Sequence, residues 1–239
     1  MASADKRMDV LYVLPTERFF LDGRCGRVSH ALGFSKGVVG HDKSLSILSG
    51  PNIGEYVDEN EKLRIFSVSG FLGFWMPFLV LRLFLLQRKA RQVVIRWRPL
   101  VPFFLIPLLF FRNKVWFEIN SITGLDSRFA IVRLISCASV CLVAKFFRLI
   151  VVSDESKRQV EKVCSNCKEI VVIRNGFDAV FFENFTPLVQ GGSGCTLVYF
   201  GRKQNYYDWD MLYSTVSRLR SEYRGLTMDI FGFDEAEGR

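Results

Sequence analysis

Short apolar runs alternate along the chain with segments of helical spacing. The apolar runs are mostly aliphatic, β-branched or aromatic, are bounded by turn-forming residues and predict buried strands. They cover residues 10–14, 44–48, 63–68, 93–97, 115–119, 149–152, 169–173, 196–200 and 226–232. Strands that alternate with helices are typical of α/β proteins. The pattern therefore predicts a doubly wound parallel sheet.

The segments between these strands carry helix signals. We expect helices over residues 28–36, 75–91, 99–111, 126–147, 153–160 and 208–223. Asp126 and Asp208 are predicted N-caps, because an aspartate side chain can accept a backbone N–H of the first turn. Trp209, Leu212 and Val216 recur at helical spacing, so the last helix should pack one face on a sheet.

The strand-and-helix pattern stops once and then starts again. The run after Lys168 breaks at Asn175-Gly176, and a polar gap precedes the next strand. We therefore predict a Rossmann-like domain over 1–185, a linker over 186–194 and the start of a second domain over 195–239. One βαβ unit cannot close a domain. The second domain is expected to be incomplete, either truncated or completed by another chain.

Composition narrows the class of protein. Hydrophobic residues make up 49% of the chain, which is enough for a sizeable core. The first residues are polar and charged, without the pattern of a signal peptide. The whole chain contains six cysteines. Together these features indicate a reduced, cytoplasmic setting.

The positive charge is unevenly distributed. Ten of the Lys and Arg residues lie between Lys62 and Phe117, where there is no Asp or Glu and where apolar residues are dense. Such a stretch suits an anionic partner, and it predicts a peripheral contact with an anionic membrane. The alternative is a set of core helices with solvated basic ends. No nucleic-acid motif accompanies the charge, so no nucleic-acid partner is predicted.

The order of these segments resembles a known family. The matching segments are DVLYVLP with its glycine loop, VVGHDKSLSILSG, VVIRWRP, VWFEIN, IVVSDESKRQV, VVIRNGFDAVFF and TLVYFGR. They resemble the retaining GT-B glycosyltransferases of the family 4 type, bacterial enzymes with two facing Rossmann-like domains. The resemblance implies transfer of a hexose from a nucleotide-diphosphate sugar to a glycan or lipid-linked acceptor, in polysaccharide or cell-envelope synthesis. It also implies that neither a metal nor another cofactor takes part.

On the donor side, the resemblance assigns four residues. It implies that Gly201 and Arg202, just after a predicted strand, contact the diphosphate, whose negative charge grows as the sugar leaves. Lys203 could replace a lysine that the family carries a few residues later, where this chain has Tyr207-Asp208. Asn120 stands where relatives often have a donor-contacting histidine. A simpler interpretation of Gly201-Arg202 is an ordinary turn at a strand end.

On the acceptor side, the resemblance implies roles for Gly23, Arg24 and Gly26 in the first glycine loop, and for Arg96 and Glu118 at strand ends. Each also has a structural interpretation. The glycines suit any loop, Arg96 can form a local ion pair, and Glu118 is more simply explained as a buried, paired carboxylate. No residue is predicted to be catalytic, and neither histidine is predicted to belong to a triad.

One family feature is missing from the sequence. The paired glutamates that bind the donor sugar in the family have no counterpart before Arg239. Two alternatives to an active transferase follow. The chain can be a non-catalytic, half-length module that binds an acceptor, a membrane or a partner chain. It can also be part of a nucleotide-sugar epimerase of the same architecture.

Overall fold

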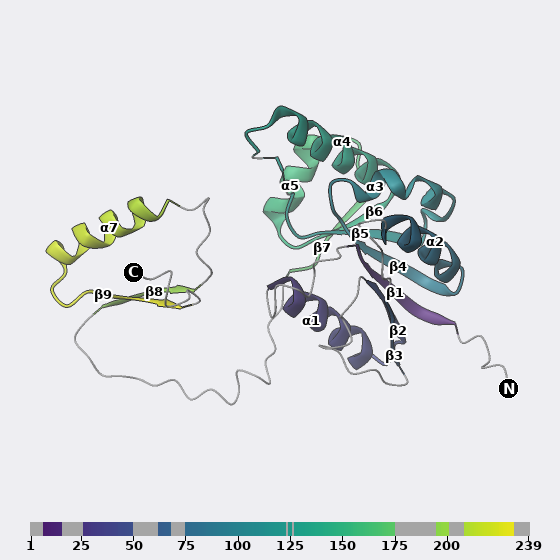
Figure 1. The fold of residues 1–239 in the computed structure, drawn as a ribbon, viewed down its shortest axis with the longest axis horizontal. Coiled ribbons are helices and arrows are strands. Elements are labelled where there is room, and N and C mark those ends of the chain that lie inside the picture. Colours follow the sequence, from purple (N-terminus) through teal and green to yellow (C-terminus); the bar gives the residue numbers. More distant parts are fainter. Residues whose placement is uncertain are drawn as a thin grey trace. The chain divides into compact units, whose positions relative to one another are not determined.

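A computed structural model describes residues 7–15, 26–49, 62–67, 75–122, 124–125, 127–174, 195–200 and 208–231 (Figure 1). Contacts between residues divide the chain into two compact units, Met1–Ala179 and Val180–Arg239. The predicted linker 186–194 and the boundary at residue 185 lie outside the described residues, so these limits remain predictions.

The first unit is built on a seven-stranded sheet in which all described pairings are parallel. The spatial order is β3-β2-β1-β4-β5-β6-β7. The strands are β1 (Met8–Leu14), β2 (Leu45–Ser49), β3 (Leu63–Ser67), β4 (Ala90–Arg96), β5 (Val115–Ile119), β6 (Arg148–Val151) and β7 (Glu169–Val172). The predicted doubly wound parallel sheet is thus confirmed, and every predicted strand in this part of the chain is present.

Helices cover both faces of this sheet (Figure 1). One face carries α1 (Gly26–Gly40), whose Ala31 packs in a buried cluster with Tyr12, Leu45 and Val94. The other face carries the other helices that the structure describes in this unit: α2 (Trp75–Gln87), α3 (Val101–Phe104) with the 3-10 helix η3 (Ile106–Phe111), α4 (Ala130–Phe146) and α5 (Asp154–Val163).

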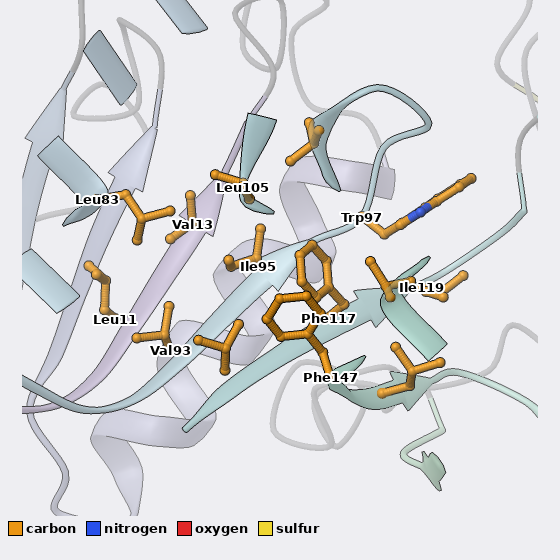
Figure 2. Close-up of a cluster of buried hydrophobic side chains, with 14 of the residues drawn as sticks. Leu11, Val13, Leu83, Val93, Ile95, Trp97, Leu105, Phe117, Ile119 and Phe147 are labelled. Carbon is orange, nitrogen blue, oxygen red and sulfur yellow. The ribbon is translucent and has the colours of Figure 1, made fainter. Parts of the chain in front are cut away.

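The larger core lies beneath this second set of helices. Figure 2 shows apolar side chains of β1, β4 and β5, among them Leu11, Ile95 and Phe117, gathered in one buried cluster. Phe117 contacts Phe147 edge-on, with ring centroids 5.1 Å apart. Alternate residues of the same strands face α1, because successive strand side chains point to opposite faces of a sheet.

Several predicted helix features differ from the structure. The helix predicted over 75–91 ends at Gln87, because Ala90 and Arg91 belong to β4. The predicted helix 99–111 is broken into α3 and η3, since Leu105 turns its backbone N–H to the carbonyl of Pro102 and a second proline, Pro107, follows. The predicted cap at Asp126 is wrong. The N-cap of α4 is Phe129, with no side-chain cap bond, so this helix begins four residues later than its predicted start, with Ala130 as its first residue.

The second unit is a single βαβ unit in its described residues. It comprises β8 (Thr196–Phe200), α7 (Trp209–Glu222) and β9 (Thr227–Phe231), and β8 pairs with β9 in parallel. Asp208 is the N-cap, as predicted, and its carboxylate accepts the backbone N–H of Met211 at 2.9 Å. Tyr199 and Trp209 join strand and helix, with ring centroids 5.2 Å apart.

The strand order creates a switch point in the first unit. From β1 the chain moves outward through β2 and β3, whereas from β4 it moves outward through β5, β6 and β7 on the other side. β1 and β4 are neighbours at this point. In open α/β sheets, ligands bind beside the carboxyl ends of the strands where the order reverses.

Candidate functional site

A buried polar cluster lies near the carboxyl ends of β1, β4 and β5. Arg96 ends β4 and is paired in register with Glu118 on β5. Tyr12 of β1 lies on the same face of the sheet, and its side chain packs in the α1-side core. His30, from α1, completes the cluster. The two strands at the switch point, β1 and β4, the next strand, β5, and the helix α1 therefore supply one side chain each.

Glu118 is the centre of this cluster. Its Oε2 accepts a hydrogen bond from the Tyr12 hydroxyl at 2.6 Å. Its Oε1 lies 2.6 Å from Nε2 of His30 and 3.2 Å from a guanidinium nitrogen of Arg96. The Glu118 and Arg96 residues are each 3% exposed, so this ion pair is removed from solvent. A buried carboxylate with these three partners is held in one orientation.

The partners also set the charge of the carboxylate. Burial by itself would raise the pKa of Glu118, but the His30 hydrogen bond, the Arg96 and His30 charges and the Tyr12 hydrogen bond outweigh it and lower the pKa to about 2. Burial first, and the Glu118 charge second, hold the pKa of Tyr12 well above its ordinary value of 10.0. Glu118 is therefore ionised and Tyr12 protonated throughout the physiological range.

Aromatic packing holds the partners in place. The Tyr12 ring lies against Phe34 of α1, with centroids 4.4 Å apart, and the Arg96 guanidinium carbon lies 6.0 Å from the Tyr12 centroid. On the opposite face, Trp97 donates its indole N–H to the Ser139 hydroxyl at 3.0 Å, which ties the end of β4 to α4. The cluster thus sits between two packed layers.

The chemistry open to this cluster centres on His30. Its side chain is 23% exposed, whereas that of Glu118 is 4% exposed. A histidine that one carboxylate orients through one ring nitrogen can exchange a proton with a substrate hydroxyl through the other. The same contacts also describe a structural ion pair that fastens α1 to the sheet.

Asn120 lies at the same edge, immediately after β5. Its residue is half-buried, and its Oδ1 atom is buried without a hydrogen-bond donor among the residues that the structure describes. An unsatisfied buried acceptor is uncommon. Asn120 can therefore accept a hydrogen bond from a ligand hydroxyl or N–H group.

The structure brings together only part of the predicted site. Arg96 and Glu118 are in contact, and Asn120 follows them at the same sheet edge. Gly26, predicted in the glycine loop, is the first residue of α1. Gly23, Arg24, Gly201, Arg202 and Lys203 lie outside the described residues. Their predicted roles in acceptor and donor binding remain predictions.

Two members of the cluster were missed by sequence reasoning. Tyr12 lies in an otherwise apolar strand, and its hydroxyl gives no pattern signal. His30 falls within the helix predicted over 28–36, and the sequence assigns it no partner and no role. A hollow lined by Arg7, Leu85, Arg88 and Lys89 lies at the opposite, amino-terminal edge of β1 and β4 and contains none of these groups.

Comparisons by sequence and by structure differ in what they find. No protein-family model matches the chain, and no curated protein matches it in sequence. A glycosyltransferase from Rickettsia africae ESF-5 matches in structure with a TM-score of 0.60 and 16% identity, covering 93% of this chain and 60% of that chain. Anabaena HepE, solved in complex with UDP, matches with a TM-score of 0.58 and 12% identity, covering 95% and 70%.

A UGT transferase from Siraitia grosvenorii, also solved with UDP, matches with a TM-score of 0.49 and 11% identity, covering 93% of this chain and 64% of that chain. The chain thus spans less than two thirds of the length of the Rickettsia and Siraitia proteins. The Rickettsia and Anabaena matches show that the chain has the Rossmann-like α/β fold of GT-B glycosyltransferases.

Proposed function

We propose that this chain forms the acceptor-side domain and the beginning of the donor-side domain of a GT-B glycosyltransferase. It would transfer a hexose from a nucleotide-diphosphate sugar to a glycan or lipid-linked acceptor. The observation that carries the proposal is the Glu118 cluster, which places an oriented histidine at the switch point of a GT-B-type sheet. The UDP present in the Anabaena structure supports a uridine nucleotide as the donor part.

On the donor side, we propose that Gly201, Arg202 and Lys203 contact the diphosphate. A backbone turn at glycine followed by two cations suits a leaving group that gains negative charge. Asn120 would accept a hydrogen bond from the donor, and its unsatisfied Oδ1 supports that role. The reaction is proposed to need no metal, because these cations would supply the charge stabilisation.

On the acceptor side, Gly23, Arg24 and Gly26 are proposed to contact the acceptor from the chain entering α1, and Arg96 and Glu118 to act through the cluster. Two stereochemical outcomes are possible. The family 4 resemblance implies retention at the anomeric carbon. The His30–Glu118 contact favours inversion instead, because an oriented imidazole can take the acceptor proton as that oxygen attacks the sugar and the nucleotide diphosphate departs.

We further propose that the protein works in the cytoplasm at the inner membrane face, in polysaccharide or cell-envelope synthesis, with peripheral lipid contact through 62–117. Among the described residues, no helix is both long and apolar enough to cross a membrane. The donor half that the resemblance leads us to expect beyond Arg239 would come from a complementing chain or a longer polypeptide.

Nucleotide-sugar binding tests the donor assignment. The full chain is heated with UDP-hexoses, GDP-hexoses or no ligand, and the unfolding midpoint is followed by fluorescence. We expect one nucleotide class to raise the midpoint, and Arg202→Ala to remove that rise. Arg218→Ala, at an exposed position of α7, is the matched control and should show the same rise of the unfolding midpoint as the parent. No rise with any nucleotide sugar would contradict donor binding by this chain.

A second candidate is a non-catalytic GT-B module that binds an acceptor, a membrane or a partner chain. The contacts that Tyr12, His30 and Arg96 make with Glu118 favour it, because they engage both carboxylate oxygens within the chain itself. An assay that measures release of the nucleotide diphosphate from a nucleotide sugar, with a lipid extract as the source of acceptor, separates the two candidates. Release by the chain, alone or with its complementing half, supports the transferase, and its absence in both supports the module.

A further inference from the structure

The helical layer over the larger core has an unusually apolar outer surface. On α2, the side chains of Phe78, Leu81 and Leu85 are 56%, 58% and 56% exposed, while Leu79 and Leu83 are fully buried. This helix is thus apolar on both its inner and its outer side. A helix on the surface of a water-soluble domain ordinarily presents polar residues outward.

The same surface continues along the chain through α3 and η3. Phe104 is 52% exposed and Phe110 is 88% exposed. Contact between Phe84 of α2 and Phe111 of η3, with ring centroids 6.1 Å apart, joins the two segments. Beyond α3, which packs against α4, Ile131 and Leu134 are 68% and 69% exposed. We call the outer side of α2, α3–η3 and the first turns of α4 the apolar face.

Every described charge on this face is positive. Arg82 lies on α2 and Arg88 follows its last residue, and both are exposed. Arg128 and Arg133, near the start of α4, are exposed as well. Between Lys62 and Ser153 the sequence contains only two acidic residues, Glu118 and Asp126, and Glu118 is buried in the cluster described above. The Arg88 guanidinium carbon lies 5.0 Å from the Phe84 centroid, so its stem follows the apolar surface while its charge can reach outward.

Other helices of the same unit show that this composition is local. On α5, exposed Glu155 accepts a hydrogen bond from Arg158 at 3.0 Å, and the outer side is polar. On α1, the apolar side chains Leu32, Phe34, Val38 and Val39 are all partly buried. The apolar face therefore has polar neighbours on α5, and it is not a general property of this fold unit.

We propose that the apolar face rests on an anionic lipid bilayer, with its aromatic and aliphatic side chains in the interface and its arginines at the headgroups. The combination of exposed Phe and Leu, positive charge and no exposed described acid is what an interfacial protein surface requires. The inference rests on the proposed function and specifies its membrane contact. Within residues 62–117, the strands β4 and β5 lie inside the sheet, so α2 and α3–η3 are the elements that contact the lipid. The first turns of α4 extend this contact.

The position of the face relates it to the candidate site. α3 and α4 follow the carboxyl ends of β4 and β5, which is the edge where Glu118 and Asn120 lie. A bilayer on this face would present a lipid-carried acceptor at that edge.

Vesicle flotation of the full chain tests the proposal. Vesicles of phosphatidylcholine, with or without phosphatidylglycerol, are mixed with the chain or with Leu81→Glu, Phe104→Glu and Met211→Glu variants. Met211 is the matched control, since it is 62% exposed and lies on α7. We expect the chain to float only with vesicles that contain phosphatidylglycerol, and to bind them more weakly at high salt. Leu81→Glu and Phe104→Glu should each bind these vesicles about tenfold more weakly than the parent. Met211→Glu should bind them as the parent does.

Three results would overturn the proposal: no flotation at low salt, equal flotation of Leu81→Glu and the parent, or flotation independent of phosphatidylglycerol. Self-association that Leu81→Glu abolishes, without vesicle binding, would instead assign the face to a second copy of this chain. Circular dichroism verifies that the variants fold. The nucleotide-sugar midpoint shift measured on the same variants keeps this test separate, because it reports the proposed transferase function whatever the vesicles show.

Discussion

Nε2 of His30 lies 2.6 Å from Oε1 of Glu118, although His30 belongs to α1 and Glu118 to β5, which is two places from β1 in the sheet order. This contact connects α1 to the switch point of the sheet. It also makes Glu118 the shared partner of an imidazole, a guanidinium and a phenol. The stability of the fold and the reactivity of His30 therefore depend on the same carboxylate.

Replacement of Glu118 by Gln should destabilise the first unit by about 3 kcal/mol, because Arg96 would remain buried without a negative partner. Urea denaturation followed by tryptophan fluorescence measures this change. Glu155→Gln removes an exposed carboxylate on α5 and should change the free energy of unfolding far less, because an ion pair in contact with solvent contributes little to stability. Equal effects of the two variants would show that the cluster contributes no more than a surface pair.

Stability should fall in acid as Glu118 takes up a proton. Its folded pKa of about 2 lies below the ordinary value of 4.5, so the unfolded chain binds the proton more tightly. The contribution is fully present above about pH 4.5 and is lost as the pH falls towards about 2. We expect a loss on the order of 3 kcal/mol across this interval. Denaturation curves at several pH values should show a smaller loss for Glu118→Gln, and identical losses would contradict the assignment.

Replacement of His30 by Asn should lower sugar transfer by about a hundredfold or more if His30 takes the acceptor proton. The nucleotide-induced rise of the unfolding midpoint should remain, because His30 is not assigned to the donor. His41→Asn, at the other histidine and in an exposed turn, is the matched control and should retain activity. NMR of the product gives its anomeric configuration and so distinguishes inversion from retention. Full activity of His30→Asn would assign the pair a structural role only.

Gly124, in the connection between β5 and α4, should not tolerate a side chain. Its φ is +96°, and a Cβ atom there would stand 2.5 Å from Oγ of Ser136, which is fully buried. We expect Gly124→Ala to destabilise the unit by about 1–3 kcal/mol. Gly33 is an exposed residue of α1, and an added methyl would have no neighbour within 4 Å, so Gly33→Ala should stabilise the unit by about 0.5–1 kcal/mol. Thermal unfolding of both variants measures the difference, and the same sign for both would refute it.

Strand positions were predictable because the code for them is local. Runs such as 115–119 are apolar and β-branched, and the structure confirms them to within a few residues. Helix starts were less predictable, because they depend on competing caps. Asp208 caps α7 as expected, whereas α4 begins after Phe129 and not at Asp126. Prolines explain why the predicted helix over 99–111 is broken.

The site was only half predictable. Arg96 and Glu118 stood out as charges at the ends of apolar strands, and parallel register brings them into contact. His30 and Tyr12 could not be assigned, since nothing near either residue in sequence records that its side chain contacts Glu118 of β5. The outer face of α2 is a similar case. Its composition was evident as a basic, apolar stretch, but which of its residues face outward depends on how the helix packs.

By itself, the sequence determined the alternation of strands and helices, the parallel α/β class and the concentration of positive charge between Lys62 and Phe117, because periodicity and composition are properties of neighbouring residues. Only the tertiary structure decided that His30 meets Glu118 and that Leu81 faces outward while Leu83 is buried. These relationships join segments far apart in the chain. They arise from strand order and helix packing, which no short stretch of sequence encodes.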